Sequence, residues 1–132
     1  SQFVKDISCE TPDVETYLYV KEYLKNYNLN IDITTKPLKN RMIEIDTKLS
    51  YMDKGKTKNK SYFEITYASI VKIDEQTKER KEIEKIILCD VQKEIYPNLE
   101  KIFLNLLSNS GFPNIKFEKK VDFEKLYNER LN

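Results

Sequence analysis

An apolar helix pattern in the last third of the chain most constrains the fold. Ile95, Leu99, Ile102, Phe103, Leu106 and Leu107 recur at intervals of three and four residues, which is the spacing of one helical face. Leu104 lies outside that stripe, so the apolar arc is wider than a helix covering a single sheet needs. We therefore expect cover on two sides, with an interface between subunits formed by Leu99, Ile102, Phe103, Leu106 and Leu107. A helix buried deep in its own monomer is the alternative.

Proline and glycine mark the boundaries of the helical region. Pro97 suits the first turn of a helix, where its missing N–H costs nothing, or it kinks a helix that runs over 82–94. Gly111-Phe112-Pro113 is typical of a helix stop. Asp122 then predicts the N-cap of a last helix, whose apolar residues are Phe123, Leu126 and Tyr127.

Four segments ahead of this region alternate apolar and polar residues, which predicts strands with one buried face. They cover 2–10, 29–35, 42–51 and 62–73. In the first segment, Phe3, Ile7 and Cys9 are expected on the buried side, with Asp6 and Glu10 on the other. Strands followed by helices predict one α+β domain over 1–132: a four-stranded antiparallel sheet, meander or Greek key, with the C-terminal helices packed on one face.

The segment between the first two strands is rich in tyrosine. Thr11-Pro12-Asp13 is typical of a helix entry, and helical spacing continues through Tyr17, Val20, Leu24 and Tyr27. A short strand at 17–20 is the alternative. Tyrosine rings at a partly exposed surface bind apolar side chains of a partner while the hydroxyl stays in water. For any single tyrosine, a place in the core is the alternative.

Composition excludes several classes of chemistry. The 132 residues carry 23 basic and 22 acidic side chains and no histidine, so histidine-based catalysis and most transition-metal sites are absent. Two glycines cannot build a phosphate loop, and two distant cysteines suit a reducing cytosol. No basic block indicates nucleic acid, and no apolar run of about 18 residues spans a membrane. We expect a binding protein without cofactor or metal; an enzyme or small-ligand binder with a deep pocket is the alternative.

A second candidate surface lies on the outward face of the predicted sheet. Asp6, Glu10, Tyr62 and Glu64 all fall on outward positions of the first and last strands. If these strands are neighbours, the four side chains form an acidic patch suited to a basic partner. An ordinary polar sheet face is the alternative.

The ends of the chain resemble SecB, the bacterial protein-export chaperone family. Residues 4–12, VKDISCETP, resemble the family's opening strand Y-x-K-D-[IL]-S-F-E-x-P. Ile95-Tyr96-Pro97, Gly111-Phe112-Pro113 and the segment 121–127, VDFEKLY, resemble its main helix, G-F-P stop and V-[ND]-F-x-x-L-[YF] ending. The resemblance covers most of the chain.

The resemblance implies a cytoplasmic, ATP-independent holdase that forms a homotetramer as a dimer of dimers. Such proteins bind unfolded precursors in apolar grooves and deliver them to the translocation ATPase SecA, without enzymatic activity or direct membrane insertion. Asp6, Glu10, Tyr62 and Glu64 match the family's acidic SecA-facing surface. The family's Pro-rich linker is replaced by the segment 13–28, where Tyr17, Tyr19, Tyr23 and Tyr27 are our candidates for client binding. The alternative is a SecB-like chaperone dedicated to one partner, such as an antitoxin.

Overall fold

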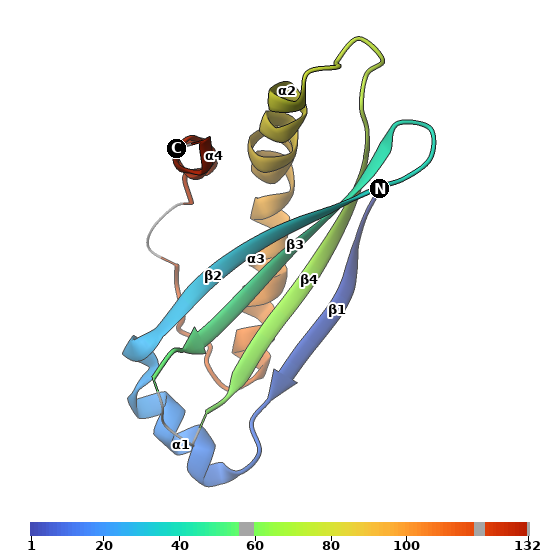
Figure 1. The fold of residues 1–132 in the computed structure, drawn as a ribbon. Coiled ribbons are helices and arrows are strands. Elements are labelled where there is room, and N and C mark those ends of the chain that lie inside the picture. Colours follow the sequence, from blue (N-terminus) through green and yellow to red (C-terminus); the bar gives the residue numbers. More distant parts are fainter. Residues whose placement is uncertain (56–59, 118–120, 132) are drawn as a thin grey trace.

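The computed structural model describes residues 1–55, 60–117 and 121–131, and it consists of an open antiparallel sheet backed by a long helix (Figure 1). The strands are β1 (Gln2–Glu10), β2 (Tyr27–Pro37), β3 (Met42–Asp53) and β4 (Tyr62–Lys72). They lie in the order β1-β4-β3-β2, all antiparallel. The strands β2, β3 and β4 follow one another directly and β1 returns beside β4, which is the Greek-key order. The predicted α+β class is confirmed.

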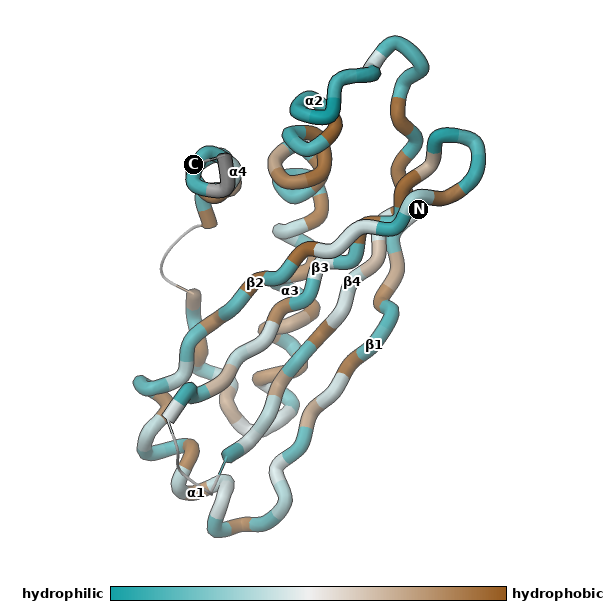
Figure 2. Tube along the Cα trace, in the orientation of Figure 1, coloured by the Kyte–Doolittle hydropathy of each residue, from teal (hydrophilic) through white to brown (hydrophobic). Residues whose placement is uncertain are grey.

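The central strands divide their side chains as the alternation predicted. Ile45 and Leu49 of β3 and Phe63 and Ile65 of β4 are fully buried on the helix side. Polar residues recur between the hydrophobic ones along these strands (Figure 2). Period-two alternation is therefore sufficient to orient a strand with neighbours on both sides.

The edge strand β1 forms as predicted, but a bulge near its start places Phe3 on the opposite face from the one predicted. The register shifts between Val4 and Asp6, which makes Lys5 the extra residue of a β-bulge. Because one extra residue inverts the alternation, Phe3 pairs with Ala68 on the outer face and Val4 pairs with Tyr67 on the helix side. After the bulge, Ile7 and Cys9 pair with Ile65 and Phe63 on the helix side, as predicted. The prediction is wrong for Phe3 and for the burial, because no residue of β1 is buried in this protomer.

The helical region begins earlier than Pro97 and continues through it. A helix α2 (Arg80–Lys85), a π-helical turn (Ile86–Asp90) and α3 (Val91–Asn109) follow without a break. Pro97 therefore lies inside α3 rather than at a helix start. The missing N–H leaves the carbonyl one turn earlier without its helical donor, and Pro97 lies on the exposed side of the helix.

The glycine stop and the aspartate cap are both confirmed. Gly111 has φ of +103°, and the N–H groups of Gly111 and Phe112 donate to the carbonyls of Ser108 and Leu107 at 3.1 and 3.0 Å. This is the Schellman pattern that ends helices at glycine. The helix α4 (Phe123–Leu131) follows, and Oδ1 of Asp122 accepts a 3.0 Å hydrogen bond from the N–H of Lys125.

The tyrosine-rich segment forms a helix across the end of the sheet (Figure 1). Helix α1 (Val14–Glu22) begins at Asp13, whose side chain accepts from the N–H of Thr16 at 2.8 Å. A 3-10 turn (Leu24–Asn26) follows, and Tyr27 already belongs to β2. The predicted helix entry is confirmed. The prediction that the helix continues to Tyr27 is wrong, because α1 ends at Glu22.

One polar pair lies inside the core. Gln92 of α3 and Thr47 of β3 are both fully buried, and Nε2 of Gln92 donates to Oγ1 of Thr47 at 2.9 Å. Each side chain satisfies the other, which removes most of the cost of burying them. The pair holds the start of α3 at a defined height over the sheet.

Candidate binding surfaces

The four predicted acidic-patch residues lie together on the sheet face opposite α3. Glu10 is paired with Tyr62 across the β1–β4 ladder, and Glu64 is paired with Ser8. Asp6 lies on the same face, two residues before Ser8, and accepts a 3.1 Å hydrogen bond from the Ser8 hydroxyl. The neighbouring first and last strands therefore bring Asp6, Glu10, Tyr62 and Glu64 onto one flat surface, which we call the outer patch.

Cations balance part of this charge. Glu64 accepts from the Tyr62 hydroxyl and lies 3.1 Å from Nζ of Lys48. Lys5 reaches over β4 to Glu44 and Asp46, at 2.7 and 2.9 Å, and these hydrogen bonds raise the pKa of Lys5 and lower that of Glu44. Neither Asp6 nor Glu10 takes part in an ion pair between the described residues. The uncompensated negative charge of the outer patch therefore lies along β1.

A second surface follows the helix side of the edge strand β2. Successive hollows share lining residues there, beginning beside α1 and ending beside α2. We call this run the β2 groove. Its walls are mixed, and their apolar side chains are Leu24, Leu29, Ile31, Ile33, Tyr51, Leu88, Ile115, Phe117, Phe123 and Leu126. Such a groove accepts the apolar side chains of an extended chain, each contributing about 1.5–3 kcal/mol when fully buried.

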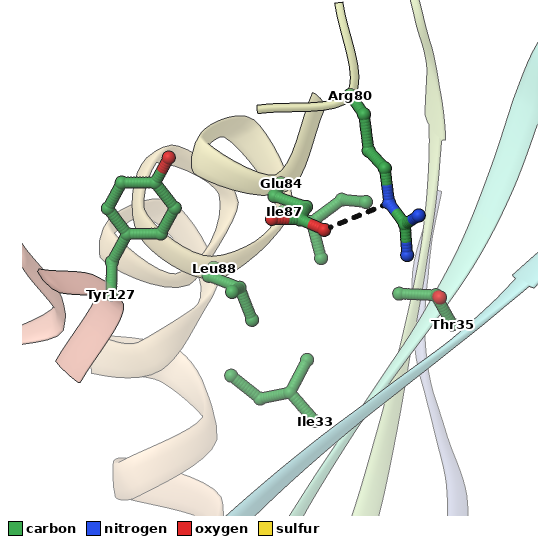
Figure 3. Close-up of a pocket in the computed structure, with 7 residues that line it drawn as sticks. All are labelled: Ile33, Thr35, Arg80, Glu84, Ile87, Leu88 and Tyr127. Carbon is green, nitrogen blue, oxygen red and sulfur yellow. Dashed lines mark hydrogen bonds and ion pairs between the residues drawn. The ribbon is translucent and has the colours of Figure 1, made fainter. Parts of the chain in front are cut away.

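The α2 end of the groove is shown in Figure 3. Ile33 of β2 and Leu88 of the π-helical turn line a hollow of about 380 Å³. Arg80 closes it from above, with its Nε 3.3 Å from Oε1 of Glu84. Tyr127 of α4 forms the remaining side, and its hydroxyl donates to the carbonyl of Lys81 at 3.1 Å. Polar and charged side chains thus line this end of the groove together with Ile33, Ile87 and Leu88.

The four predicted client-binding tyrosines are not brought together. Tyr27 lines the groove, but it is only 7% exposed and its hydroxyl donates to the carbonyl of Ser61 at 2.9 Å. Tyr17 stacks on Phe112 and is half-buried. The ring centroids of Tyr19 and Tyr23 lie 4.5 Å apart, with the rings tilted by 35°. Client binding by these residues remains a prediction.

Tyr51 is a tyrosine of the chain that was not among the four predicted client-binding residues, yet it lines two of the hollows, and burial raises its pKa. The signal that pointed to this surface was the alternation of Leu29, Ile31 and Ile33 on β2. All three are only partly buried in the protomer. A half-buried apolar row on an edge strand indicates an open surface.

The predicted interface residues of α3 have different surroundings. Leu99, Phe103 and Leu107 are fully buried within the protomer's own core, so the alternative of an internally buried helix is correct for these three. Ile102 and Leu106 are partly buried. Helical periodicity identified the apolar face, but it did not identify which side the sheet covers. An interface on α3 is left with Ile102, Leu106 and the off-stripe Leu104.

The solvent side of α3 carries another hollow. Tyr96, Leu104, Val121 and Phe123 form its apolar wall, and the Tyr96 ring lies 5.3 Å from that of Phe123. The Tyr96 hydroxyl is buried and has no partner among the described residues, and burial raises its pKa.

No group of three His, Cys, Asp or Glu side chains in the described part of the chain is arranged to hold a metal ion. No helix in that part is both long and apolar enough to cross a membrane.

The open sheet, its single backing layer of helices and the two extended surfaces define an α+β protein with one open sheet face and a groove along an edge strand. The model of the SecB family, described as preprotein translocase subunit SecB, matches residues 1–132. The chain belongs to this family, which confirms the resemblance and supports a chaperone role in protein export.

Individual relatives agree with this assignment. The chain is 56% identical over 130 residues to the putative protein-export protein SecB of Pelagibacter ubique, covering 98% of this chain and 93% of the relative. It is 26% identical to protein-export protein SecB of Parvibaculum lavamentivorans, covering 98% and 76%. The SecB-like chaperone Rv1957 of Mycobacterium tuberculosis, solved with a ChAD peptide from the HigA1 antitoxin, has the same fold, with a TM-score of 0.64 at 8% identity over 92% of this chain and 85% of that one.

Proposed function

We propose that this protein is an ATP-independent holdase that binds unfolded precursor proteins and delivers them to SecA for export. The observation that carries the proposal is the β2 groove, an open run of hollows with apolar side chains in its walls beside an edge strand. An extended client places alternate side chains in such a groove. Each contact is weak, and several grooves in one assembly bind one long client through effective concentration.

Delivery to SecA is assigned to the outer patch. Asp6 and Glu10 supply its uncompensated negative charge, and they lie on the sheet face opposite the helices, away from the groove. A basic segment of SecA is attracted to this surface, and the client is left in place during the encounter.

Assembly as a cytoplasmic homotetramer, a dimer of dimers, completes the proposal. The exposed edge β1 supports it, because Phe3, Val4 and Ile7 are 46, 39 and 48% exposed on a strand with an unpaired edge within the described sheet. A second copy covers such an edge. Ile102 and Leu106 of α3 supply the second contact, and unpaired Cys9 and Cys89 suit a reducing compartment.

The test is an aggregation assay without nucleotide. A chemically denatured precursor is diluted into buffer with and without the protein, and light scattering is followed. We expect the protein to delay scattering at equal molar amounts, with no effect of added ATP. Unchanged scattering at a large excess of the protein would contradict the proposal.

A second candidate function is service to a single dedicated partner, such as an antitoxin. Helix α1 favours it, because α1 replaces the family's Pro-rich linker and is fastened to the end of α3 by the Tyr17–Gly111 hydrogen bond of 2.9 Å. A fixed wall at one end of the groove favours one client shape over many. Binding across a panel of unrelated unfolded proteins decides: similar affinities support the export holdase, and one tight partner supports the dedicated chaperone.

A further inference from the structure

Three lysines surround the α1 end of the β2 groove. Lys21 and Lys25 come from α1 and the turn after it, and Lys116 comes from the segment after α3. Lys116 lies 91 positions after Lys25 in the sequence. The fold, and not a local run of lysines, therefore brings these charges together. All three side chains are exposed.

No carboxylate compensates these lysines among the described lining residues. The two hollows at this end include Lys21, Lys25 and Lys116, and no Asp or Glu. None of the ion pairs between described residues uses any of the three. The rim is therefore positively charged in a chain whose formal net charge is only +1.

The floor beneath this rim is apolar and aromatic. Tyr51 is 8% exposed, and Phe112 is 4% exposed, and Leu24, Ile115 and Phe117 complete the walls. An aromatic or aliphatic side chain fits this floor better than the phosphate and sugar of a nucleic acid. An apolar floor within a cationic rim is thus complementary to an apolar residue with anionic neighbours.

The opposite end of the groove has a different charge pattern. Asp32, Glu84 and Glu129 line the hollows there, with Arg80 beside Glu84. The lysine rim is therefore a local feature of the α1 end rather than a property of the whole groove.

We propose that the α1 end of the β2 groove selects client segments in which an apolar side chain is flanked by aspartate or glutamate. This inference rests on the proposed client-binding function and specifies its substrate class. Neighbouring residues of an extended chain are about 3.3 Å apart along the strand. Flanking carboxylates one or two positions away therefore reach the rim while the central side chain occupies the floor.

The test uses three fluorescein-labelled peptides that share one apolar core and carry aspartate, serine or lysine on both flanks. Their dissociation constants for the full chain are measured by fluorescence anisotropy. We expect the aspartate-flanked peptide to bind most tightly, the serine-flanked peptide less tightly and the lysine-flanked peptide most weakly. The dissociation constants of the tightest and weakest peptides should differ roughly tenfold, which a few exposed ion pairs can provide. The span should shrink in about 1 M salt, where charges are screened beyond about 3 Å, while the serine peptide still binds.

Reversing the charge of two rim lysines tests whether the peptide preference arises at this end of the groove. The variant Lys25→Glu with Lys116→Glu should favour the lysine-flanked peptide and leave the serine-flanked peptide near its original affinity. The matched control is Lys39→Glu with Lys72→Glu, which makes the same change in net charge at exposed residues outside the groove. The control should keep the original order.

Each of the other possible outcomes would contradict the lysine-rim inference. Equal affinities for the three peptides, tighter binding of the lysine peptide to the unaltered protein, or an equal shift in the control variant would overturn the lysine-rim inference and leave the holdase in place. Failure of all three peptides to bind would overturn both. Displacement of the aspartate peptide by an oligothymidylate at lower concentration than by unlabelled peptide would assign the rim to nucleic acid instead.

Discussion

The ring of Tyr17 occupies the space that a side chain on Gly111 would need. A Cβ atom at Gly111 would lie 2.4 Å from Cε1 of Tyr17, and the Tyr17 hydroxyl donates a 2.9 Å hydrogen bond to the Gly111 carbonyl. The same glycine ends α3 at a φ of +103°. One residue thus both stops the long helix and receives α1, which places α1 at the end of the β2 groove.

The variant Gly111→Ala should destabilise the protein by about 1–3 kcal/mol, because alanine disfavours this φ and its methyl group collides with Tyr17. The measurement is the free energy of unfolding in urea. Tyr17→Phe should cost less, about 0.5–1.5 kcal/mol, since it removes only the hydrogen bond. The control is Gly55→Ala, where no positive φ is required and the nearest atom is 3.1 Å away on the Asp53 side chain. Equal losses at the two glycines would refute this account of the α1–α3 contact.

The sequence predicted the sheet better than it predicted the surfaces. Alternation placed Ile45, Leu49, Phe63 and Ile65 correctly, because central strands have one covered face. At the bulge, the alternation shows only that Lys5 interrupts the apolar side of the first strand. It does not identify Lys5 as an extra residue, because that is recognised from the partner strand's register.

The groove and the α3 contacts were harder to predict for a related reason. Periodicity identifies an apolar face but does not say what covers it. Leu99 and Ile102 share one predicted stripe, yet only Leu99 is fully buried. The lysine rim depends on residues from separate elements, Lys25 and Lys116, and only the tertiary fold brings them together.

The Lys5–Glu44 pair should make the attachment of β1 sensitive to acid. The pKa of Glu44 lies below its ordinary value of 4.5 in the folded protein, and the largest cause is the hydrogen bond that Lys5 donates to its carboxylate. A lowered folded pKa stabilises the fold fully above pH 4.5, and the contribution is lost as pH falls through the lowered value. Glu44→Gln should therefore lose less stability than the unaltered protein between about pH 7 and pH 3.

Urea unfolding at the two pH values measures this difference, with Glu75→Gln, a change at an exposed loop carboxylate, as the control. An acid sensitivity of Glu44→Gln equal to that of the unaltered protein would show that the pair does not contribute.

The double variant Asp6→Lys and Glu10→Lys should weaken binding to SecA while the solution mass stays the same. These carboxylates carry the uncompensated charge of the outer patch, and reversal turns attraction of a basic segment into repulsion. Surface plasmon resonance on immobilised SecA measures the loss, expected as roughly tenfold or more. Glu15→Lys with Glu22→Lys on α1 makes the same net change and should have little effect. A collapsed assembly in the Asp6/Glu10 variant would argue that this face holds subunits together instead.

Light scattering coupled to gel filtration should give about four times the chain mass of 15.8 kDa. Ile7→Asp, at an exposed apolar residue of the β1 edge, should lower that mass because a buried charge is costly at an interface. Leu18→Asp changes a residue of α1 that is 59% exposed and should leave the mass unchanged. A monomer at micromolar concentration of the unaltered protein would contradict the proposed tetramer.

Hydrogen–deuterium exchange with a denatured precursor bound tests the central claim most directly, because it reports both binding and its location. We predict slower exchange along the β2 groove, at 29–33 and 111–117, with β1 residues 6–10 unchanged until SecA is added. Protection confined to the outer patch, or no protection at saturating precursor, would contradict the account.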